Sequence, residues 1–460
     1  MTTPLDRGRY GSDSMRALFT DQSRYRHWIR VEGAVAAVQG RLGVIPADAA
    51  AEISAKADAY QPDLTRVAAI EAESRHELFA VVQQFAESCG PHQGYVHHGL
   101  TSSDVQDTAM ALQLDSAIAL LGQRLADLLT SLRDRSVKGR GQIMIGRTHG
   151  QHAQPVTLAF KLAVHLDQMT RCLERLDQLR ERAVMGKVSG AVGSLAGLGS
   201  EGGQVQAEAL ERLGLQRAQI CTQAVARDRF AEFVGWAALT AACLENAATE
   251  VRNLQRTEIG EVAEHFVTGA QIGSSAMPHK RNPVLSERVC SLSRLLRSLV
   301  GPALENVVTW HERDLANSAN ERFVLPEVCV LLEEALITAT TVVDGLLTFP
   351  ERMAENLARS QHAHLSEAIL LALVDTGMPR LDAYRVVQRA SSTAAAERRD
   401  LLHVLAADDQ VTCVITPAQL TSLARSGTDT GLCDELAHEA VQRADRALAA
   451  RSGGQKCRAR

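Results

Sequence analysis

The amino-acid sequence predicts an all-α protein built on long helices. Strand-forming patterns are nearly absent along the 460 residues, and long stretches repeat apolar residues at intervals of three and four. Aromatic residues make up only 4% of the chain and only 12 residues are proline, which suits long uninterrupted helices better than a sandwich or barrel. A chain of this length can bury a large core, either as two to four domains or as one extended helical architecture.

The clearest helix covers the region 162–179. Its apolar stripe consists of Leu162, Leu166, Met169, Leu173, Leu176 and Leu179. The charged residues between them lie off this stripe, which is the pattern of an amphipathic helix. Two further long helices are expected over residues 232–256 and 284–308, which are rich in alanine or leucine. Near residues 349–353 the helical pattern begins again with a smaller helical segment.

Four segments interrupt the helical pattern, and the polar motifs lie in them. They cover residues 90–104, 146–155, 186–203 and 271–287. The third contains GLGSEG, which matches the GxGxxG pattern of dinucleotide-binding loops. It lacks the preceding hydrophobic strand and the acidic residue about 20 positions later that such a site needs. We therefore interpret it as a helix-breaking loop.

Charge and cysteine content argue against several classes of protein. The formal net charge of -5 gives no basic excess of the kind that drives nucleic-acid binding. The nine cysteines include no CxxC pair, so we expect free thiols in the cytoplasm rather than a disulfide framework or a zinc site. Neither a signal-peptide pattern nor a long uncharged apolar run is found, so we expect no membrane association.

Histidines cluster in two of the interruptions, as His97 with His98 and as His149 with His152. Neither pair has the HExxH arrangement of a zinc site. Single histidines more often cap helices or bond to backbone carbonyls. We expect neither a metal nor a cofactor.

The segment LTSSDVQDTA has the pattern of a helix start. Thr101, Ser102 or Ser103 can cap the helix, and Asp104 adds a favourable negative charge to the first turn. Capping alone would explain these residues. Hydroxyl and N–H groups at a helix N-terminus also form a ready cradle for a carboxylate, which is the functional alternative.

The segment QIGSSAMPHKRNPVLSE concentrates polar chemistry between helix-breaking residues. A glycine precedes two serines, and prolines lie on either side of the basic residues, so we expect a loop that could close. Ser274 is a candidate base or nucleophile, Lys280 a compact cation and Asn282 a neutral donor. Glu287 lies one turn into the next helix. A plain charged loop is the simpler alternative, because loops are commonly polar.

Seven sequence blocks together resemble the fumarase/aspartase superfamily and, within it, the adenylosuccinate lyase family. In chain order they are GRYGSDSMR, ESRHELFA, VHHGLTSSDVQDTA, GRTHGQHAQPVT, QRTEI, GSSAMPHKRNP and WHERDLANSANERFVLPE. The resemblance implies a three-domain helical fold, with an N-terminal helical domain (1–108), a central long-helix bundle (109–349) and a small C-terminal helical domain (350–460). It also implies a homotetramer with a twenty-helix core, in which loops of three subunits form each active site.

The activity that the resemblance implies is β-elimination of fumarate. A proton leaves the carbon beside a carboxylate, and the C–N bond then breaks. The carbanion charge spreads into that carboxylate, which is costly unless cations and donors surround it. By resemblance the reacting groups are Ser274 as base, His149 as general acid, Lys280 and Asn282 beside the carbanion charge, Glu287 orienting the acid, and His76 assisting in substrate binding.

The resemblance also assigns substrate-binding positions. Thr101, Ser102 and Thr148 match positions that bind the succinyl carboxylates, and Gln223 matches a substrate-positioning glutamine. His97 is assigned to the same substrate-binding set. The positions that match the nucleotide site, where arginines would clamp the phosphate, are Arg9, Tyr10, Arg288, Arg313, Ser318 and Arg322.

The implied substrates are adenylosuccinate, cleaved to AMP and fumarate in purine biosynthesis, and the succinylated aminoimidazole carboxamide ribotide of the same pathway. One alternative is a lyase that releases fumarate from another N-succinyl substrate, against which the arginine set argues. A second is a 3-carboxymuconate cycloisomerase, which lacks the histidine block found at 148–153. A third is a structural protein that keeps the fold, against which the intact Ser274, His149 and Lys280 argue.

Overall fold

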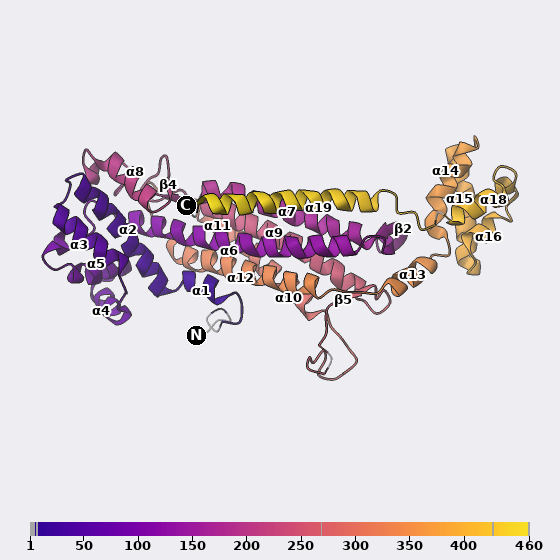
Figure 1. Ribbon diagram of the computed structural model, residues 1–460, viewed down its shortest axis with the longest axis horizontal. Helices are drawn as coiled ribbons and strands as arrows, with labels where there is room; N and C mark the ends of the chain where they lie inside the picture. The colour runs from indigo at the N-terminus through magenta and orange to yellow at the C-terminus, as the bar shows by residue number, and fades with distance from the viewer. Residues whose placement is uncertain (1–4, 6–7, 268, 426, 459–460) are drawn as a thin grey trace. The chain divides into compact units, whose positions relative to one another are not determined.

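The computed structural model describes residue 5 and residues 8–267, 269–425 and 427–458, with the backbone alone for 452–458. The chain is mostly helical, as predicted, and its strands are short (Figure 1). It divides into two compact units. The first comprises residues up to Ala126, Arg171–Glu245 and Arg288–Thr338, and the second comprises Asp127–Thr170, Asn246–Glu287 and the chain from Ala339 onward. The division into three domains stays a prediction.

The first unit contains the helices of the N-terminal part and several short elements from later in the chain. Its elements are α1 (Asp13–Leu18), α2 (Asp21–Arg41), α3 (Ala47–Asp58), α4 (Leu64–Ser74), α5 (Glu77–Ser88), the 3-10 helix η1 (Gly90–Tyr95), β3 (Met185–Gly186), η2 (Ala196–Leu198), α8 (Gly202–Arg212), β4 (Gln216–Arg217) and α11 (Val300–Glu305). β3 and β4 form a two-stranded parallel sheet. The α2 and α3 helices bury apolar faces that include Ile29, Val35 and Ile53, as expected of an antiparallel helical pair.

Five long helices contribute residues to both units. They are α6 (Ser102–Lys138), α7 (Leu158–Ala183), α9 (Asp228–Leu254), α10 (Val284–Ser298) and α12 (Ser318–Asp344). The helices predicted at 162–179 and 232–256 correspond to α7 and α9. The one predicted at 284–308 is interrupted after Ser298. Pro302 has no N–H to donate to the Ser298 carbonyl, so an unbroken helix cannot continue through this point.

The second unit combines a β-hairpin, a group of small helices and a C-terminal long helix. Its elements are β1 (Ile143–Thr148), β2 (Gln151–Thr157), β5 (Val262–Ala263), β6 (Leu347–Thr348), α13 (Pro350–Ala358), η3 (Ala363–Leu365), α14 (Ser366–Asp375), α15 (Arg380–Glu397), α16 (Leu401–Leu405), α17 (Asp409–Thr412), α18 (Pro417–Arg425) and α19 (Cys433–Arg458). In Figure 1 α14, α15, α16 and α18 form one group. This group encloses a core that includes Ile369, Leu373 and Leu405.

The segment 146–155, expected only as an interruption, folds as most of an antiparallel hairpin of β1 and β2. Its two turn residues, His149 and Gly150, have φ of +53° and +76°. Positive φ at both central residues is the signature of the two-residue turn whose twist suits a hairpin. The hairpin is held against the rest of the second unit by a core that includes Met144, Leu254 and Met353. In the described part of the chain, no helix combines the length and apolar character needed to cross a bilayer.

Candidate functional site

The first turn of α6 carries the hydroxyls predicted to bind carboxylates. Thr101 directly precedes Ser102, the first residue of the helix. The Thr101 amide donates to Asp104 Oδ2 at 2.9 Å, which is one half of a capping box with aspartate in the place of glutamate. Thr101 and Ser102 stay partly exposed. The helix terminus is thus held by a hydrogen bond from the Thr101 backbone amide to the Asp104 side chain. The Thr101 and Ser102 side chains remain in contact with solvent.

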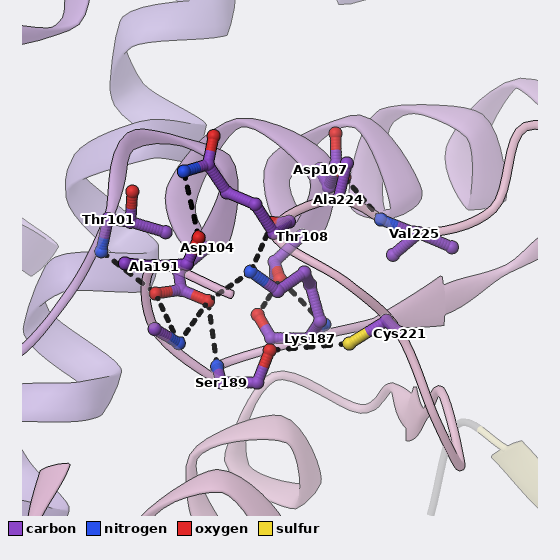
Figure 2. A network of polar contacts seen from close by, with 12 residues as sticks. Thr101, Asp104, Asp107, Thr108, Lys187, Ser189, Ala191, Cys221, Ala224 and Val225 are labelled. Atoms are coloured by element: carbon purple, nitrogen blue, oxygen red, sulfur yellow. Dashed lines mark hydrogen bonds and ion pairs between the residues drawn. The ribbon is translucent and has the colours of Figure 1, made fainter. Parts of the chain in front are cut away.

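A buried ion pair joins this helix terminus to two other loops of the first unit (Figure 2). Lys187 Nζ lies 2.6 Å from Asp104 Oδ1, and neither side chain is exposed. The same ammonium group donates to the Gln223 carbonyl at 2.5 Å. The Gln223 side chain donates to the Ala191 carbonyl at 2.9 Å. The predicted substrate-positioning glutamine is therefore connected to the predicted carboxylate cradle through one lysine.

The loop after Lys187 approaches the segment before Gln223 at backbone distance. Gly193 has a φ of +84°, and a Cβ added there would lie 2.2 Å from the Cys221 carbonyl oxygen. Only glycine fits both the conformation and the space. The same loop is also held to α6, because the Asp104 carboxylate accepts from the amides of Ser189, at 2.7 Å, and Gly190, at 3.1 Å.

His76, His97 and Ser102 line one pocket of about 410 Å³. The His76 ring caps α5, because its Nδ1 accepts from the Phe79 amide at 3.1 Å. A neutral ring that accepts at Nδ1 carries its proton at Nε2. That Nε2 lies 3.5 Å from Ser102 Oγ. Two of the predicted substrate-binding residues and one predicted catalytic histidine therefore share a surface.

His97 is tied to a buried carboxylate. Its Nδ1 lies 2.6 Å from Glu32 Oε1, and its amide donates to Glu32 Oε2 at 3.1 Å. Burial alone would lower the pKa of His97, but the attraction and hydrogen bond of Glu32 outweigh burial, so the pKa is raised. His97 consequently keeps its positive charge to a higher pH than a free histidine.

Three of the residues predicted to bind the nucleotide line a second pocket of the first unit, with a volume of about 120 Å³. They are Arg313, Ser318 and Arg322. Burial and the nearby charge of Arg227 lower the pKa of Arg313. Arg322 donates to Glu77 Oε2 at 2.6 Å. The Arg322 guanidinium, which is predicted to bind a phosphate, is thus already paired with the Glu77 carboxylate.

The other predicted nucleotide-binding residues do not line this pocket. Arg9 is exposed and Tyr10 is partly buried, and the Tyr10 carbonyl accepts from Arg16 at 2.8 Å. Arg288 lies 3.4 Å from Glu334. Within the first unit, the structure therefore gathers half of the predicted nucleotide set.

The loop that contains Ser274 folds back on itself in the second unit. Asn282 Nδ2 donates to the Gly273 carbonyl at 3.0 Å. A Cβ added to Gly273 would lie 2.3 Å from the Lys280 carbonyl oxygen, so the two ends of the loop approach as closely as glycine allows. Ser274 Oγ accepts from the Met277 amide at 3.1 Å. The loop is mostly exposed, yet its ends are fixed.

Lys280, Asn282 and Glu287 line a third pocket, of about 820 Å³, between this loop and the end of α9. The start of α10 is held by Glu264, whose carboxylate accepts from the amides of Leu285, at 3.1 Å, and Ser286, at 2.7 Å. This cap sets the position from which the predicted orienting carboxylate of Glu287 projects. Ser274 does not line this pocket.

Thr148 and His149 lie at the exposed tip of the β1–β2 hairpin. The strand behind them is anchored by Arg147, which forms two hydrogen bonds of 2.9 Å and 2.8 Å to Glu261. Glu261 is fully buried and also accepts from Asn356 at 2.9 Å. The exposed His149 is thus carried by a strand that is fixed to the buried part of its own unit.

Comparison with known proteins places these motifs in a family. Residues 8–295 match the Lyase family, and residues 363–440 match the adenylosuccinate lyase C-terminus. The adenylosuccinate lyase of Pyrococcus horikoshii is 43% identical over 420 residues, which are 91% of this chain and 93% of that protein. That of Methanothermobacter thermautotrophicus is 39% identical over 441 residues, 96% of this chain and 98% of that protein. The chain belongs to the adenylosuccinate lyase family.

Solved structures agree with the fold predicted from the sequence. A fumarate lyase from a Mesorhizobium species has a TM-score of 0.86 and 31% identity, covering 94% of this chain and 98% of its own. The 3-carboxy-cis,cis-muconate lactonizing enzyme from Pseudomonas putida has a TM-score of 0.86 and 30% identity, covering 97% of this chain and all of its own. The all-helical fumarase/aspartase fold predicted from the sequence is confirmed.

The ionic groups beneath the predicted site carry little signal in the sequence. The one signal for Lys187 is that it is the single charge in the otherwise small and apolar run GKVSGAVGS. The sequence pattern indicates Asp104 only as a first-turn charge. No local pattern indicates Arg227, which makes two hydrogen bonds to Asp107, at 2.8 Å and 2.9 Å. Among the described residues, no group of three His, Cys, Asp or Glu side chains is arranged to hold a metal ion.

Proposed function

We propose that this protein releases fumarate from adenylosuccinate to give AMP, and from the succinylated aminoimidazole carboxamide ribotide by the same chemistry. Adenylosuccinate lyases at about 40% identity over nearly the whole chain support this substrate class. The arginine-lined pocket of the first unit supports a substrate that carries a phosphate.

The proposed reaction is an elimination in two steps. The alkoxide of Ser274 removes a proton from the methylene carbon of the succinyl group, and the electron pair spreads into the adjoining carboxylate. Lys280 and Asn282 stabilise that charge. The electron pair of the carbanion then forms the double bond of fumarate while the C–N bond breaks, and its bonding pair leaves with the nitrogen, which His149 protonates. Glu287 orients His149, while His76 assists in binding the substrate.

The single observation that carries this proposal is the folded shape of the Ser274 loop. Ser274 Oγ accepts a backbone amide hydrogen bond, which favours a negatively charged oxygen over a neutral one. The Asn282 bond to Gly273 brings the Lys280 end of the loop to the serine end. A serine can serve as a base only in such surroundings, because its hydroxyl is a very weak acid in water.

The proposed active site is shared between subunits. The first unit provides His76, the carboxylate cradle and the arginine pocket, and the second unit provides Ser274 and His149. We place these groups together in a cytoplasmic homotetramer with a twenty-helix core. Exposed apolar side chains on α11, on α12 and in the connection between them support association between subunits, among them Leu304, Val308, Trp310, Leu315 and Phe323.

The test is turnover by the purified full-length chain. Adenylosuccinate is added and the change in absorbance is followed, with fumarate measured separately. Fumarate and AMP should form in equal amounts. No turnover at micromolar enzyme would contradict the assignment, and the muconate compound used by the structurally similar lactonizing enzyme would then be tested as substrate.

Subunit sharing has its own test. Ser274→Ala and His76→Ala variants should each be inactive alone, and a mixture refolded together should regain part of the activity. Mixed tetramers contain some sites assembled from one intact first unit and one intact second unit. Activity that does not return in a verified mixed tetramer would contradict the shared site.

A further inference from the structure

The strongest feature outside the proposed reacting groups is the buried pair of Asp104 and Lys187. Both side chains are fully buried, and the pair distance is 2.6 Å. Removing two charges from water is costly, and a well-packed apolar pair of similar size would often be at least as stable. Fold stability alone therefore does not account for the pair.

The hydrogen bonds of Asp104 connect separate parts of the chain. Its two carboxylate oxygens accept from the backbone amides of Thr101, Ser189 and Gly190 and from Lys187 (Figure 2). One carboxylate thus fixes both the start of α6 and the loop that follows Lys187. The charge makes each of these bonds stronger than a neutral one.

Lys187 is fixed at both its backbone and its side chain. The Thr108 hydroxyl donates to the Lys187 carbonyl at 2.7 Å and accepts from its amide at 3.0 Å. The ammonium group then reaches the Gln223 carbonyl at 2.5 Å. The Gln223 amide in turn donates to the Glu312 carbonyl at 3.2 Å. The lysine therefore ties the backbone of Gln223 to the first turn of α6, beside a second tie in which Asp107 accepts from the Val225 amide at 2.8 Å.

We infer that Asp104 and Lys187 are positioning residues for the succinyl group. They hold the carboxylate-binding hydroxyls of Thr101 and Ser102 at a fixed distance from Gln223, and neither touches the substrate. This inference rests on the proposed function, because that function makes these residues the carboxylate contacts. A preformed set of donors binds an anion without the cost of ordering loops at that moment.

The first experiment measures hydrogen exchange in the wild-type protein without substrate. The amides of Ser189 and Gly190 should exchange far more slowly than those of the exposed segment 275–281, because both donate to a buried carboxylate. Equal exchange in the two segments would overturn the inference. The result does not depend on which substrate the enzyme uses.

The second experiment compares Lys187→Met, Asp104→Asn and the double variant. Each single change leaves an uncompensated polar group in the core, so the melting temperature should fall. The double variant removes both charges and should recover most of that loss. Its KM for adenylosuccinate should nevertheless stay raised about tenfold or more, because the Gln223 carbonyl has lost its donor. Exchange in the segment 221–225 should also remain faster than in wild type.

The matched control is Ile53→Ala in α3, where Ile53 is fully buried and is not part of this network. It should lower the melting temperature without changing KM. A double variant that regains both the wild-type KM and the wild-type exchange pattern would show that the pair only stabilises the fold, and would overturn the inference. If the double variant does not fold, the wild-type exchange measurement decides. Absence of turnover by wild type would contradict the proposed function alone.

Discussion

The proposed carboxylate cradle of the first unit, at the start of α6, and the Ser274 loop of the second unit are built in opposite ways. The cradle rests on a fully buried ion pair, and its loops touch at backbone distance. The Ser274 loop is mostly exposed and is closed by the Asn282 bond to the Gly273 carbonyl. The proposed elimination accounts for the difference. In that reaction the substrate's carboxylates are present throughout and suit a rigid site, whereas the proposed base must approach the substrate carbon after binding and suits a segment free to move.

The largest expected effect is a loss of catalytic rate, without a loss of stability, when Ser274 in the exposed loop is changed. Ser274→Ala should lower kcat by about a thousandfold, as expected for loss of a positioned base. The melting temperature should hardly change, because the hydroxyl accepts only an exposed amide hydrogen bond. Steady-state kinetics and thermal unfolding measure the two quantities. Ser275→Ala is the control and should retain activity. If the Ser274→Ala variant kept the wild-type kcat, the assignment of Ser274 as the base would be contradicted.

A pair of glycine substitutions tests the contrast directly. An added Cβ would lie 2.2 Å from a carbonyl oxygen at Gly193 and 2.3 Å at Gly273. Gly193→Ala should lower the melting temperature by several degrees, because the clash is inside a packed network and the residue has positive φ. Gly273→Ala should leave the melting temperature nearly unchanged and lower kcat roughly tenfold or more, because the exposed loop relaxes into another shape.

Gly203→Ala in α8 is the control for both, because a Cβ there meets nothing within 4 Å. It should be neutral or slightly stabilising. If Gly193→Ala and Gly273→Ala change stability equally, the two regions do not differ in rigidity, and the comparison fails.

The smallest expected effect concerns the pH dependence of stability in the first unit. The pKa of His97 is raised in the folded protein, since Glu32 outweighs the opposing effect of burial. The stabilisation is therefore complete below the unfolded pKa of about 6.5 and is lost as pH rises through the higher folded pKa. His97→Gln should lower the melting temperature more at pH near 6 than at pH near 9, by on the order of 1 °C.

Thermal unfolding across this pH range measures the effect, and His98→Gln serves as the control because His98 is exposed. A difference between wild type and His97→Gln that is constant with pH would show that the Glu32 contact does not depend on the imidazolium charge.

Some parts of the site could be predicted from sequence because their signal is local. The Ser274 loop lies within a short stretch in which glycine, proline, serine and lysine carry both the conformation and the chemistry. The capping pattern before α6 is local as well, since a cap and its partner are three residues apart. The hairpin at residues 146–155 has a weaker local signal, because the first residue of its two-residue turn is His149, whereas asparagine or aspartate usually precedes the glycine of such turns.

The sequence by itself determined the helical class, the long amphipathic helices, the family and the identity of the proposed reacting groups. These depend on periodicity and on short motifs, which are properties of neighbouring residues. Only the tertiary structure decided that Lys187 pairs with Asp104 across 83 positions of the chain, and that Glu77 forms an ion pair with Arg322. Such pairs join residues far apart in sequence, and their strength comes from a burial that exists only once the chain has folded.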